Sequence, residues 1–495
     1  MSGRKIGFLL LLLVFGATIE TVWSVHGDLR LGPEGCRVVS GRFYGPSWSF
    51  EQTAERALSG AAPRVEISNA FGDVKVIAGA PGVVRAKLRK VVYQPTEDRA
   101  RAFADRIELR LAGDGQPLRV GTNRSELERG EQVGFETHLQ VEAPADTVLT
   151  VRNEHGRVDV AGIAAADVTS SFEGVSVERL LGELKVDSRH GDVSVSEVGG
   201  PVVLGSRFGA VELRDLRGPA RVDLQHGDLK AEQTGALEVR QQYGSLTADG
   251  VGGDLVVRAT HAELRANDVT GKADLETSFG GVHLERVGGE ARGRVEHGGF
   301  HAEDVTGGVD AETSHDGITL ARVGGPVEAH ARFGGLEAHG LARGARVRAE
   351  NGDVQLEGFS GPVDVQVQRG SAQLRPRAVL DAPLTVEVGN GEARLAVPEG
   401  SRLSLLAQSR RGEVRSELPG LASTGSEGGP GHRLQAQLGG GGANVTVRAD
   451  GDVTLESQSA SAIADQPIAR PSARPPAEQA AATPRPAERA NPTPR

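Results

Sequence analysis

The stretch DSRHGDVSVSEVGG, residues 187–200, decides the fold, because close variants of it recur along the chain. Each variant places a ring residue at a glycine-containing corner, continues with alternating apolar residues, and closes on another glycine. Two further histidine versions end at Gly235 and Gly325, and phenylalanine takes the place of histidine in versions such as ETSFGGVHLERVGG, residues 276–289. The sequence therefore repeats one structural unit many times.

The corner residues follow one another at a nearly constant spacing of 18, which loosens to 21 near the end of the series. A coil of this length cannot bury its own apolar face, whereas coils stacked about 4.8 Å apart bury it against their neighbours. We predict an all-β fold, a β-solenoid (β-helix) with about 18 residues per coil and about twelve coils between residues 155 and 369. The pattern leaves the handedness and the number of faces open. The series is His155, Phe172, His190, Phe208, His226, Tyr243, His261, Phe279, His297, His315, Phe333, Asn351, Arg369, Asn390 and Arg411.

Apolar residues alternate within each unit, which indicates strands. In one unit Val222, Leu224 and His226 fall on the same face, and the phase slips by one residue after Gly227. We therefore expect the rings to face the interior and to stack from coil to coil, contributing about 0.5–1.5 kcal/mol per pair. If the histidines of this stack are buried and neutral, stability should decline as the pH falls below about 6.5.

The composition narrows the functional classes. The 495 residues include 66 acidic and 56 basic side chains with interleaved signs, giving a net charge of −10. No basic patch stands out, so we expect no nucleic-acid partner. Cys36 is the only cysteine, which excludes an intramolecular disulfide framework and a cysteine-based zinc site.

The N-terminus has the pattern of an export signal. Arg4 and Lys5 precede the apolar run 6–17, which is shorter than the roughly 20 residues that a membrane span requires. We assign residues 1–25 to a signal peptide and leave open an uncleaved membrane anchor within 6–25. Either interpretation places the rest of the chain outside the cytosol.

The remaining chain divides by pattern into five parts. A helix is expected within the β-rich part that precedes the coils, because Thr96 is a favourable N-cap and Ala100, Phe103, Ala104 and Ile107 form an apolar stripe. Eight prolines among the last 29 residues predict an extended, disordered tail. The parts are a linker (26–63), a capping domain with one short helix (64–154), regular solenoid (155–375), irregular coils and a C-terminal cap (376–456), and a Pro/Ala/Arg-rich tail (457–495).

The order of motifs resembles a known family. RVEISNAFGDVKV (64–76) is followed by the helix-bearing insert, LQVEAP (139–144), VRNEHGRVDV (151–160) and many G-x-V-x-L coils. This order is similar to that of the bacterial "putative adhesin" family of exported β-solenoid proteins, over residues 64–375. The resemblance implies a repeat fold and an envelope or surface location, and it supplies no catalytic residue.

Recurring acids raise the question of an active site. Asp192, Asp228 and Asp353 each follow a corner residue by two positions, so they are spread along the rod instead of gathering in one place. No HExxH, phosphate-loop or G-x-S-x-G motif is present in the sequence. We predict no enzymatic activity, no catalytic residues and no cofactor.

One cluster has the chemistry of a metal site. VHLE (282–285) and FHAE (300–303) are 18 residues apart, so His283, Glu285, His301 and Glu303 would point outward on successive coils. The four side chains could converge on a divalent cation, but a solvated charged face is the favoured interpretation. We assign no metal site.

These observations favour a non-enzymatic exported repeat protein that acts as a scaffold or adhesin-like surface for an unknown ligand in the periplasm, the envelope or at the cell surface. The alternative is a carbohydrate-binding or polysaccharide-cleaving β-helix protein. A third hypothesis is a periplasmic partner of an envelope signalling system, with the tail as its docking segment. The oligomeric state does not follow from the sequence.

Overall fold

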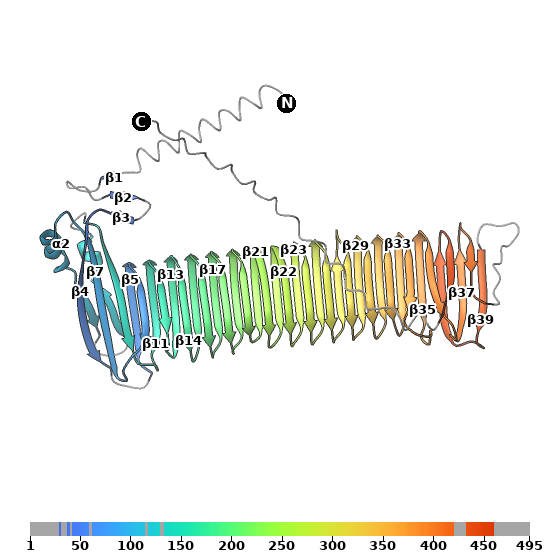
Figure 1. Ribbon diagram of the computed structural model, residues 1–495, viewed down its shortest axis with the longest axis horizontal. Coiled ribbons are helices and arrows are strands. Elements are labelled where there is room, and N and C mark those ends of the chain that lie inside the picture. Colours follow the sequence, from blue (N-terminus) through green and yellow to red (C-terminus); the bar gives the residue numbers. More distant parts are fainter. Residues whose placement is uncertain are drawn as a thin grey trace, which may run out of the picture.

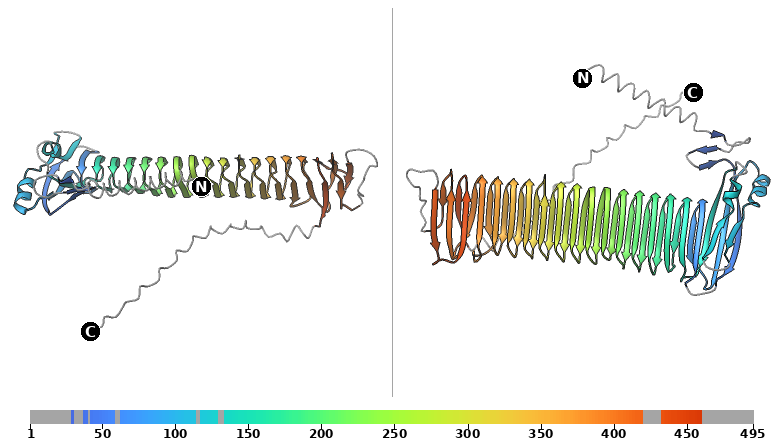
Figure 2. Two further views of the ribbon diagram at one scale, coloured as in Figure 1. Left: turned by 90° about the horizontal axis from the view of Figure 1, so that it is seen from above. Right: turned by 180° about the vertical axis from the view of Figure 1, so that it is seen from behind.

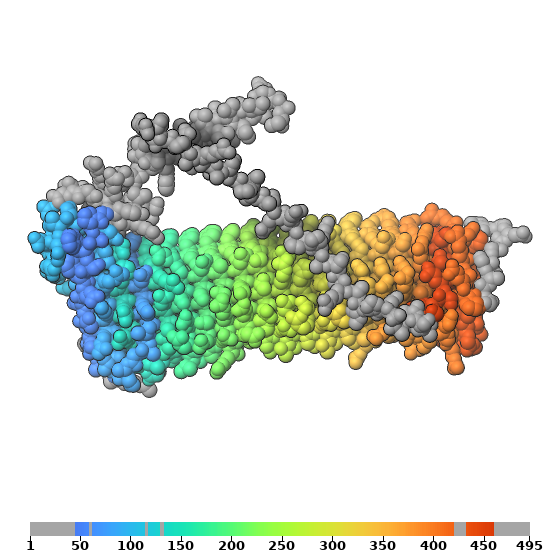
Figure 3. Space-filling view, in the orientation of Figure 1, coloured from blue at the N-terminus to red at the C-terminus, as the bar shows by residue number. Residues whose placement is uncertain are grey.

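The computed structural model describes residues 29–30, 37–39, 42–58, 62–113, 117–128, 133–419 and 432–459. The chain forms a long rod with a β-rich cap at its N-terminal end (Figure 1). The rod is a β-solenoid of about 14 turns with about 18 residues per turn, which confirms the predicted fold class. On the face that Figure 3 shows, side chains lie close together along the coloured part of the rod.

Each coil contributes two strands, so the solenoid has two faces (Figure 2). β15 (Leu184–His190) pairs in parallel with β17 (Val202–Phe208), and β16 (Val193–Val198) pairs in parallel with β18 (Val211–Leu216). The register follows the repeat, since His190 lies opposite Phe208 in the ladder. Constant spacing therefore places equivalent residues directly above one another.

The other coils follow the same rule. Two 15-residue strands, β21 (Leu237–Val251) and β22 (Leu255–Val269), run through the corner and contribute to both faces. The remaining strands of the first face are β11 (Val148–His155), β13 (Ala165–Phe172), β19 (Ala220–His226), β23 (Ala273–Phe279), β25 (Ala291–His297), β27 (Val309–Thr313), β29 (Val327–Phe333), β31 (Ala345–Asn351), β33 (Val363–Arg369) and β35 (Leu384–Asn390). Those of the second face are β12 (Val158–Ala161), β14 (Val175–Leu180), β20 (Leu229–Thr234), β24 (Val282–Val287), β26 (Phe300–Val305), β28 (Ile318–Val323), β30 (Leu336–Leu341), β32 (Val354–Phe359), β34 (Ala372–Pro376) and β36 (Ala393–Pro398).

The core lies between the two faces. Val202 and Leu204 of β17 are buried, as are Val211 and Leu213 of β18, while Val203 is exposed. Burying a side chain of this size contributes about 1.5–3 kcal/mol. Because each coil contacts only its neighbours, this core is continuous along the rod instead of concentrated at one centre.

The expected burial of the corner rings is wrong. His226 and Phe208 fall on the inward side by alternation, but both are exposed. The last buried residue before the ring is Leu224 in one coil and Ser206 in the other. The chain turns immediately after the ring, so the ring lies at the corner between the two faces. The facing strand does not extend far enough to cover it. The sequence-based prediction that stability declines below about pH 6.5 required buried corner histidines. Because these rings are exposed, that prediction no longer applies.

The corner glycines pack too closely for a side chain. Gly227 has a φ of +143°, and a Cβ added there would lie 2.0 Å from the carbonyl oxygen of Gly209. The same contact recurs one coil earlier, between Gly209 and Gly191. These positions require glycine both for the backbone angle and for the distance between coils.

The cap is larger than the sequence indicated. β4 (Ser47–Ala57) lies in the range assigned to a linker, yet it pairs along its whole length with β7 (Val83–Tyr93). This pairing partner is about 35 residues away, so local pattern could not reveal it. The predicted helix is present as α2 (Glu97–Ala104), and a second short helix is α3 (Arg124–Leu127). The other cap strands are β5 (Arg64–Phe71), β6 (Val74–Ala78), β8 (Leu109–Ala112), β9 (Leu118–Thr122) and β10 (Phe135–Ala143), and β1 (Leu29–Arg30), β2 (Arg37–Val39) and β3 (Arg42–Tyr44) form a separate small sheet.

The C-terminal end is interleaved. β40 (Ala443–Ala449) inserts between β35 and β37 (Leu403–Ser409), and β41 (Val453–Gln458) inserts between β36 and β38 (Val414–Ser416). β39 (His432–Leu438) pairs antiparallel with β37 and ends the first face. Of the tail assigned to 457–495, residues 457 and 458 belong to β41, and those after 459 lie outside the described residues.

The predicted signal or anchor segment, residues 1–25, also lies outside the described residues. Within the part of the chain that is described, no helix has the length and apolar character needed to cross a membrane.

Candidate functional site

A row of stacked rings along one rim is the most regular surface feature of the rod. Adjacent ring centroids are 4.1–5.8 Å apart, and their planes differ by 3–22°. This ring ladder extends the predicted series backwards by one residue of the cap, Phe71. Its members are Phe71, His155, Phe172, His190, Phe208, His226, Tyr243, His261, Phe279, His297, His315 and Phe333.

The ring ladder shows its edges to solvent and keeps its faces covered. The exposed fractions of Phe172, Phe208, Tyr243, Phe279 and Phe333 are 43–52%. At one end the Arg124 guanidinium lies 4.6 Å from the centroid of Phe71, and at the other end Asn351 follows Phe333 in the ladder register. A ligand that stacks on an aromatic face, as bases do, needs a free face. The rings between Phe71 and Phe333 offer none, because each stacks on a ring of both neighbouring coils.

In several coils a buried polar residue lies two positions before the ring. Asn153 Nδ2 donates to the carbonyl oxygen of Gly156 at 2.7 Å, and Gln241 Nε2 donates to that of Ser245 at 3.1 Å. Thr277 Oγ1 donates to Ala262 O at 3.2 Å. These bonds satisfy corner carbonyls that the strand ladder leaves free. Sequence reasoning missed this row, although its signal is a polar residue that recurs inside an otherwise apolar alternation.

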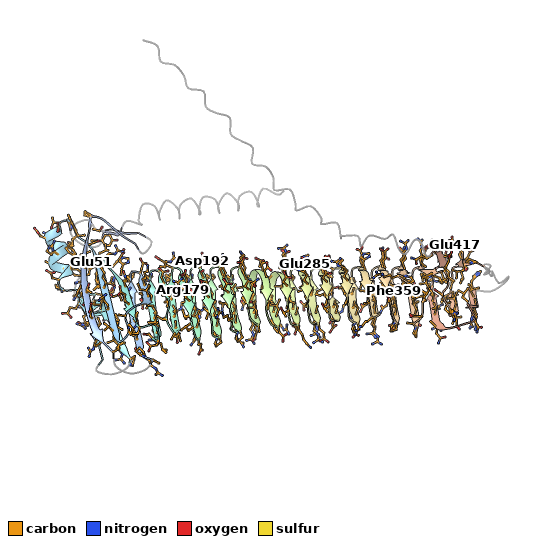
Figure 4. All side chains as sticks on the ribbon, turned by 60° about the horizontal axis from the view of Figure 1, so that its bottom comes forward. Glu51, Arg179, Asp192, Glu285, Phe359 and Glu417 are labelled. Atoms are coloured by element: carbon orange, nitrogen blue, oxygen red, sulfur yellow. The ribbon has the colours of Figure 1, made fainter. Side chains whose placement is uncertain are left out.

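The recurring corner acids join successive coils. Asp192 Oδ1 accepts a hydrogen bond from the Ala210 amide at 2.9 Å, and Asp228 Oδ1 accepts one from the Ser245 amide at 2.8 Å. Asp353 does the same with the Ser371 amide at 2.8 Å. Figure 4 shows Asp192 at a long edge of the rod. The carboxylates are therefore occupied by backbone donors one coil further on.

The four residues considered for a metal site do not converge. The rings of His283 and His301 are 5.8 Å apart, but Glu285 pairs with Arg286, and Glu303 pairs with Arg322. Burial is the largest cause that lowers the pKa of His283, and the neighbouring His301 acts in the same direction. Among the described residues, no group of three or more His, Cys, Asp or Glu is arranged to hold a metal ion.

Charged side chains form a second row on the second face. Asp268, Arg286, Asp304 and Arg322 occupy equivalent positions in four successive coils, each with a φ of +53° to +58°. Arg286 Nε lies 2.6 Å from Asp268 Oδ1, and Arg322 Nε lies 2.5 Å from Asp304 Oδ1. Alternating signs thus pair opposite charges between coils.

One titratable cluster lies where the cap meets the solenoid. His138 Nδ1 is 3.1 Å from Asp73 Oδ2, and its Nε2 is 3.0 Å from Glu136 Oε2. Tyr93 donates its hydroxyl to Glu136 at 2.8 Å, and burial with this bond raises the pKa of Tyr93 to about 12. Burial opposes a charged His138, but the hydrogen bonds that the protonated ring donates to both carboxylates outweigh it and raise the His138 pKa. The His138 hydrogen bonds in turn lower the pKa of Asp73 and of Glu136.

This cluster predicts an optimum of stability in mild acid. A raised His138 pKa adds stability that is complete below its unfolded value near 6.5 and disappears as the pH rises through the folded value. The lowered pKa values of Asp73 and Glu136 add stability that is lost as the pH falls below about 4. We expect the thermal midpoint at pH 5.5 to be higher than that at pH 9, because the raised pKa of His138 stabilises the folded state only while this side chain is protonated.

His138→Gln tests this prediction, because it removes the charge and keeps hydrogen-bonding capacity. The difference between the midpoints at pH 5.5 and pH 9 should shrink in this variant. His330→Gln, on the outer face of β29, is the matched control and should keep the wild-type difference. An unchanged pH profile in His138→Gln contradicts the assignment.

The stacking in the ring ladder predicts that removing a single surface ring lowers the stability of the rod measurably. Phe208→Ala removes the stacks with His190 and His226, at centroid distances of 5.0 Å each. At about 0.5–1.5 kcal/mol per stack, we expect urea denaturation to show a loss of about 1–3 kcal/mol. Val203→Ala on the same strand removes an outward residue of similar exposure and should change stability by less than about 0.5 kcal/mol. Equal losses would show that the stacking adds nothing.

Solved structures that are similar to this chain share little of its sequence. No curated protein matches the chain. A solved structure of a "putative cell adhesion protein" from Clostridium sporogenes has 8% identity, covers 83% of this chain and 100% of its own, and has a TM-score of 0.15. A "putative adhesin" from Parabacteroides distasonis has 9% identity, coverages of 68% and 97%, and a TM-score of 0.14. Scores this low carry no argument about fold or function.

A family model gives the decisive match. The model described as Toastrack DUF4097 matches residues 129–456, which span the last cap strand and the solenoid. This match confirms the resemblance identified from the motif order. The chain belongs to the Toastrack DUF4097 family.

Proposed function

We propose that this protein is a non-enzymatic exported rod that serves as a scaffold or adhesin-like surface in the cell envelope. The observation that carries the proposal is that the recurring corner acids bond to the backbone of the next coil. Asp192, Asp228 and Asp353 accept backbone amides of the next coil, so they hold the rod together. A long stack of coils with both charge signs on each face can present an extended surface to a partner.

The charged surface supports this proposal. Ion pairs connect neighbouring coils, as between Lys272 and Glu290 at 2.9 Å and between Arg292 and Asp310 at 2.9 Å. Side chains such as Arg179 and Glu285 project along the rod (Figure 4). An alternating pattern of this kind favours partners that make many weak polar contacts over a long footprint, because exposed pairs are individually worth about 0–1 kcal/mol.

The N-terminal sequence supports export. The apolar run 6–17 follows two basic residues, and the chain holds a single cysteine, so its fold does not depend on an internal disulfide in either redox compartment. Cell fractionation with N-terminal sequencing of the mature protein tests the location. We expect the protein outside the cytoplasmic fraction, either cleaved near residue 25 or retaining the run as an anchor. Recovery in the cytoplasmic fraction would contradict the proposal.

A polysaccharide-cleavage assay beside a glycan array separates scaffold from enzyme. We expect no cleavage by the full-length protein at any substrate concentration tested. Cleavage that disappears in Asp228→Asn but persists in Asp223→Asn, an outward acid of β19 in the same coil, would overturn the proposal in favour of a polysaccharide-cleaving β-helix. Glycan binding without cleavage would fit the adhesin-like surface and name its ligand class.

A further inference from the structure

A groove of about 990 Å³ runs along the rod where the first-face strands begin, from β23 to β35. Its floor follows one position per coil, and five successive coils place glycine or proline there: Gly308, Pro326, Gly344, Pro362 and Pro383. Long side chains are absent from these five positions, so a trough opens there between the outward residues that flank it. The equivalent positions before β23 and β25 carry Lys272 and Glu290. The three prolines are exposed within it.

We propose that the C-terminal segment of the same chain, residues 460–495, docks in this groove. The exit point of the chain carries the first argument. Gln458 ends β41, and its carbonyl oxygen accepts the Glu399 amide at 3.0 Å, directly after β36. In the coils the second strand ends at the edge where the next first strand begins. The chain therefore leaves the rod beside the groove, at the end marked by Pro383.

The repeat of the groove matches an extended proline-rich chain. Glycine and proline alternate from Gly308 to Pro362, so like positions recur every two coils, at about 9.6 Å. A polyproline II helix repeats every three residues, at about 9.3 Å. Residues 460–495 contain eight prolines, the composition that favours this helix. One turn of such a segment would thus advance by two coils and present the same face to each glycine position.

The reach of the segment is sufficient. Six coil steps separate β23 from β35, or about 29 Å. About ten residues in polyproline II conformation, at about 3.1 Å each, span this length. Residues 467–476, PIARPSARPP, are enough to fill the groove, and residues 460–466 connect them to the last strand.

The charges are complementary. The groove is lined by six acidic and four basic side chains, a net charge of −2. Residues 460–495 hold five arginines and three acidic residues, a net charge of +2. Glu328, near the middle of the groove, is exposed and has no ion-pair partner among the described residues. The two arginines of 467–476, Arg470 and Arg474, supply the charge that this carboxylate lacks. The proposal is independent of the envelope function proposed above.

Site-specific photo-crosslinking in the full-length protein tests the docking. A benzophenone amino acid replaces Gln366, an exposed groove residue of β33, and the crosslinked peptides are identified by mass spectrometry. We expect intramolecular crosslinks to peptides from 460–495. Gln225, an exposed residue of β19 on the same face, is the matched control position and should give at least tenfold fewer.

Charge variants sharpen the result. Arg470→Glu with Arg474→Glu should lower the crosslink yield at position 366 several-fold, and adding Glu328→Arg should recover it. Mixing isotopically labelled and unlabelled protein separates crosslinks within one chain from those between chains. Equal yields at positions 366 and 225, crosslinks only between chains, or a yield that the arginine reversals leave unchanged would each overturn the proposal.

Discussion

Truncating Phe300 to alanine should destabilise the rod by about 3–5 kcal/mol, the usual cost of removing a large buried aromatic side chain. Phe300 begins β26 and is 1% exposed. Its ring occupies the space over Gly293 of β25, where an added Cβ would lie 2.0 Å from Phe300 Cε2. The cavity would face both neighbouring coils, because each coil contacts the one before and the one after it.

The preceding coil shows how the same space is filled differently. Leu275 lies in register with Gly293, and Val282 lies in register with Phe300. A large residue on one strand is thus matched by a small one on the other. Gly293→Leu alone should overfill the site and cost about 1–3 kcal/mol or more. The double variant Gly293→Leu/Phe300→Val recreates the Leu275 and Val282 pair, so it should recover most of the loss.

A double-mutant cycle by chemical denaturation measures this coupling. The single variants Gly293→Leu and Phe300→Val and their double variant are compared with the wild type. The interaction energy is the difference between the stability loss of the double variant and the sum of the two single losses. We expect a favourable coupling of about 1–3 kcal/mol between the two substitutions. Additive losses would contradict the packing of Phe300 over Gly293.

Gly227→Ala should have an effect of similar size through the backbone. The φ of +143° is unfavourable for alanine by about 1–3 kcal/mol, and the Cβ would lie 2.0 Å from the Gly209 carbonyl oxygen. Because that oxygen belongs to the neighbouring coil, relief requires the two coils to separate, at a further cost of about 1–3 kcal/mol. We expect a total loss of about 2–6 kcal/mol in denaturation and faster amide exchange in β17 and β19.

Gly205→Ala is the matched control for this prediction. Gly205 lies in the middle of β17, and the nearest atom to its added Cβ is the Val186 carbonyl oxygen at 4.0 Å. Alanine fits there, and it should leave stability unchanged or raise it by about 0.5–1 kcal/mol, since glycine is unfavourable within a strand. Losses of equal size in both variants would show that the corner has no special requirement.

The 18-residue spacing by itself determined the coil, the parallel register and the stacking of His190 on Phe208, because a constant period places equivalent residues in adjacent rungs of one ladder. Alternation also identified the buried valines and leucines of each strand. The same alternation misplaced the rings, since it assigns a side of the strand but not the point where the facing strand ends. That point depends on the glycine corner, whose backbone angle the sequence leaves open.

Long-range pairing decided the rest. Strand β4 joins the cap, and β40 inserts beside β35 more than 50 residues after it, because unpaired edges gain hydrogen bonds from whichever strand reaches them. The sequence identified Asp192 and Glu303 as acidic residues, but it did not identify their partners. The tertiary structure shows that Asp192 accepts the Ala210 amide and that Glu303 pairs with Arg322. A repeat encodes contacts between neighbouring coils directly in its period, whereas ends, corners and charge pairing depend on groups that the period does not bring together.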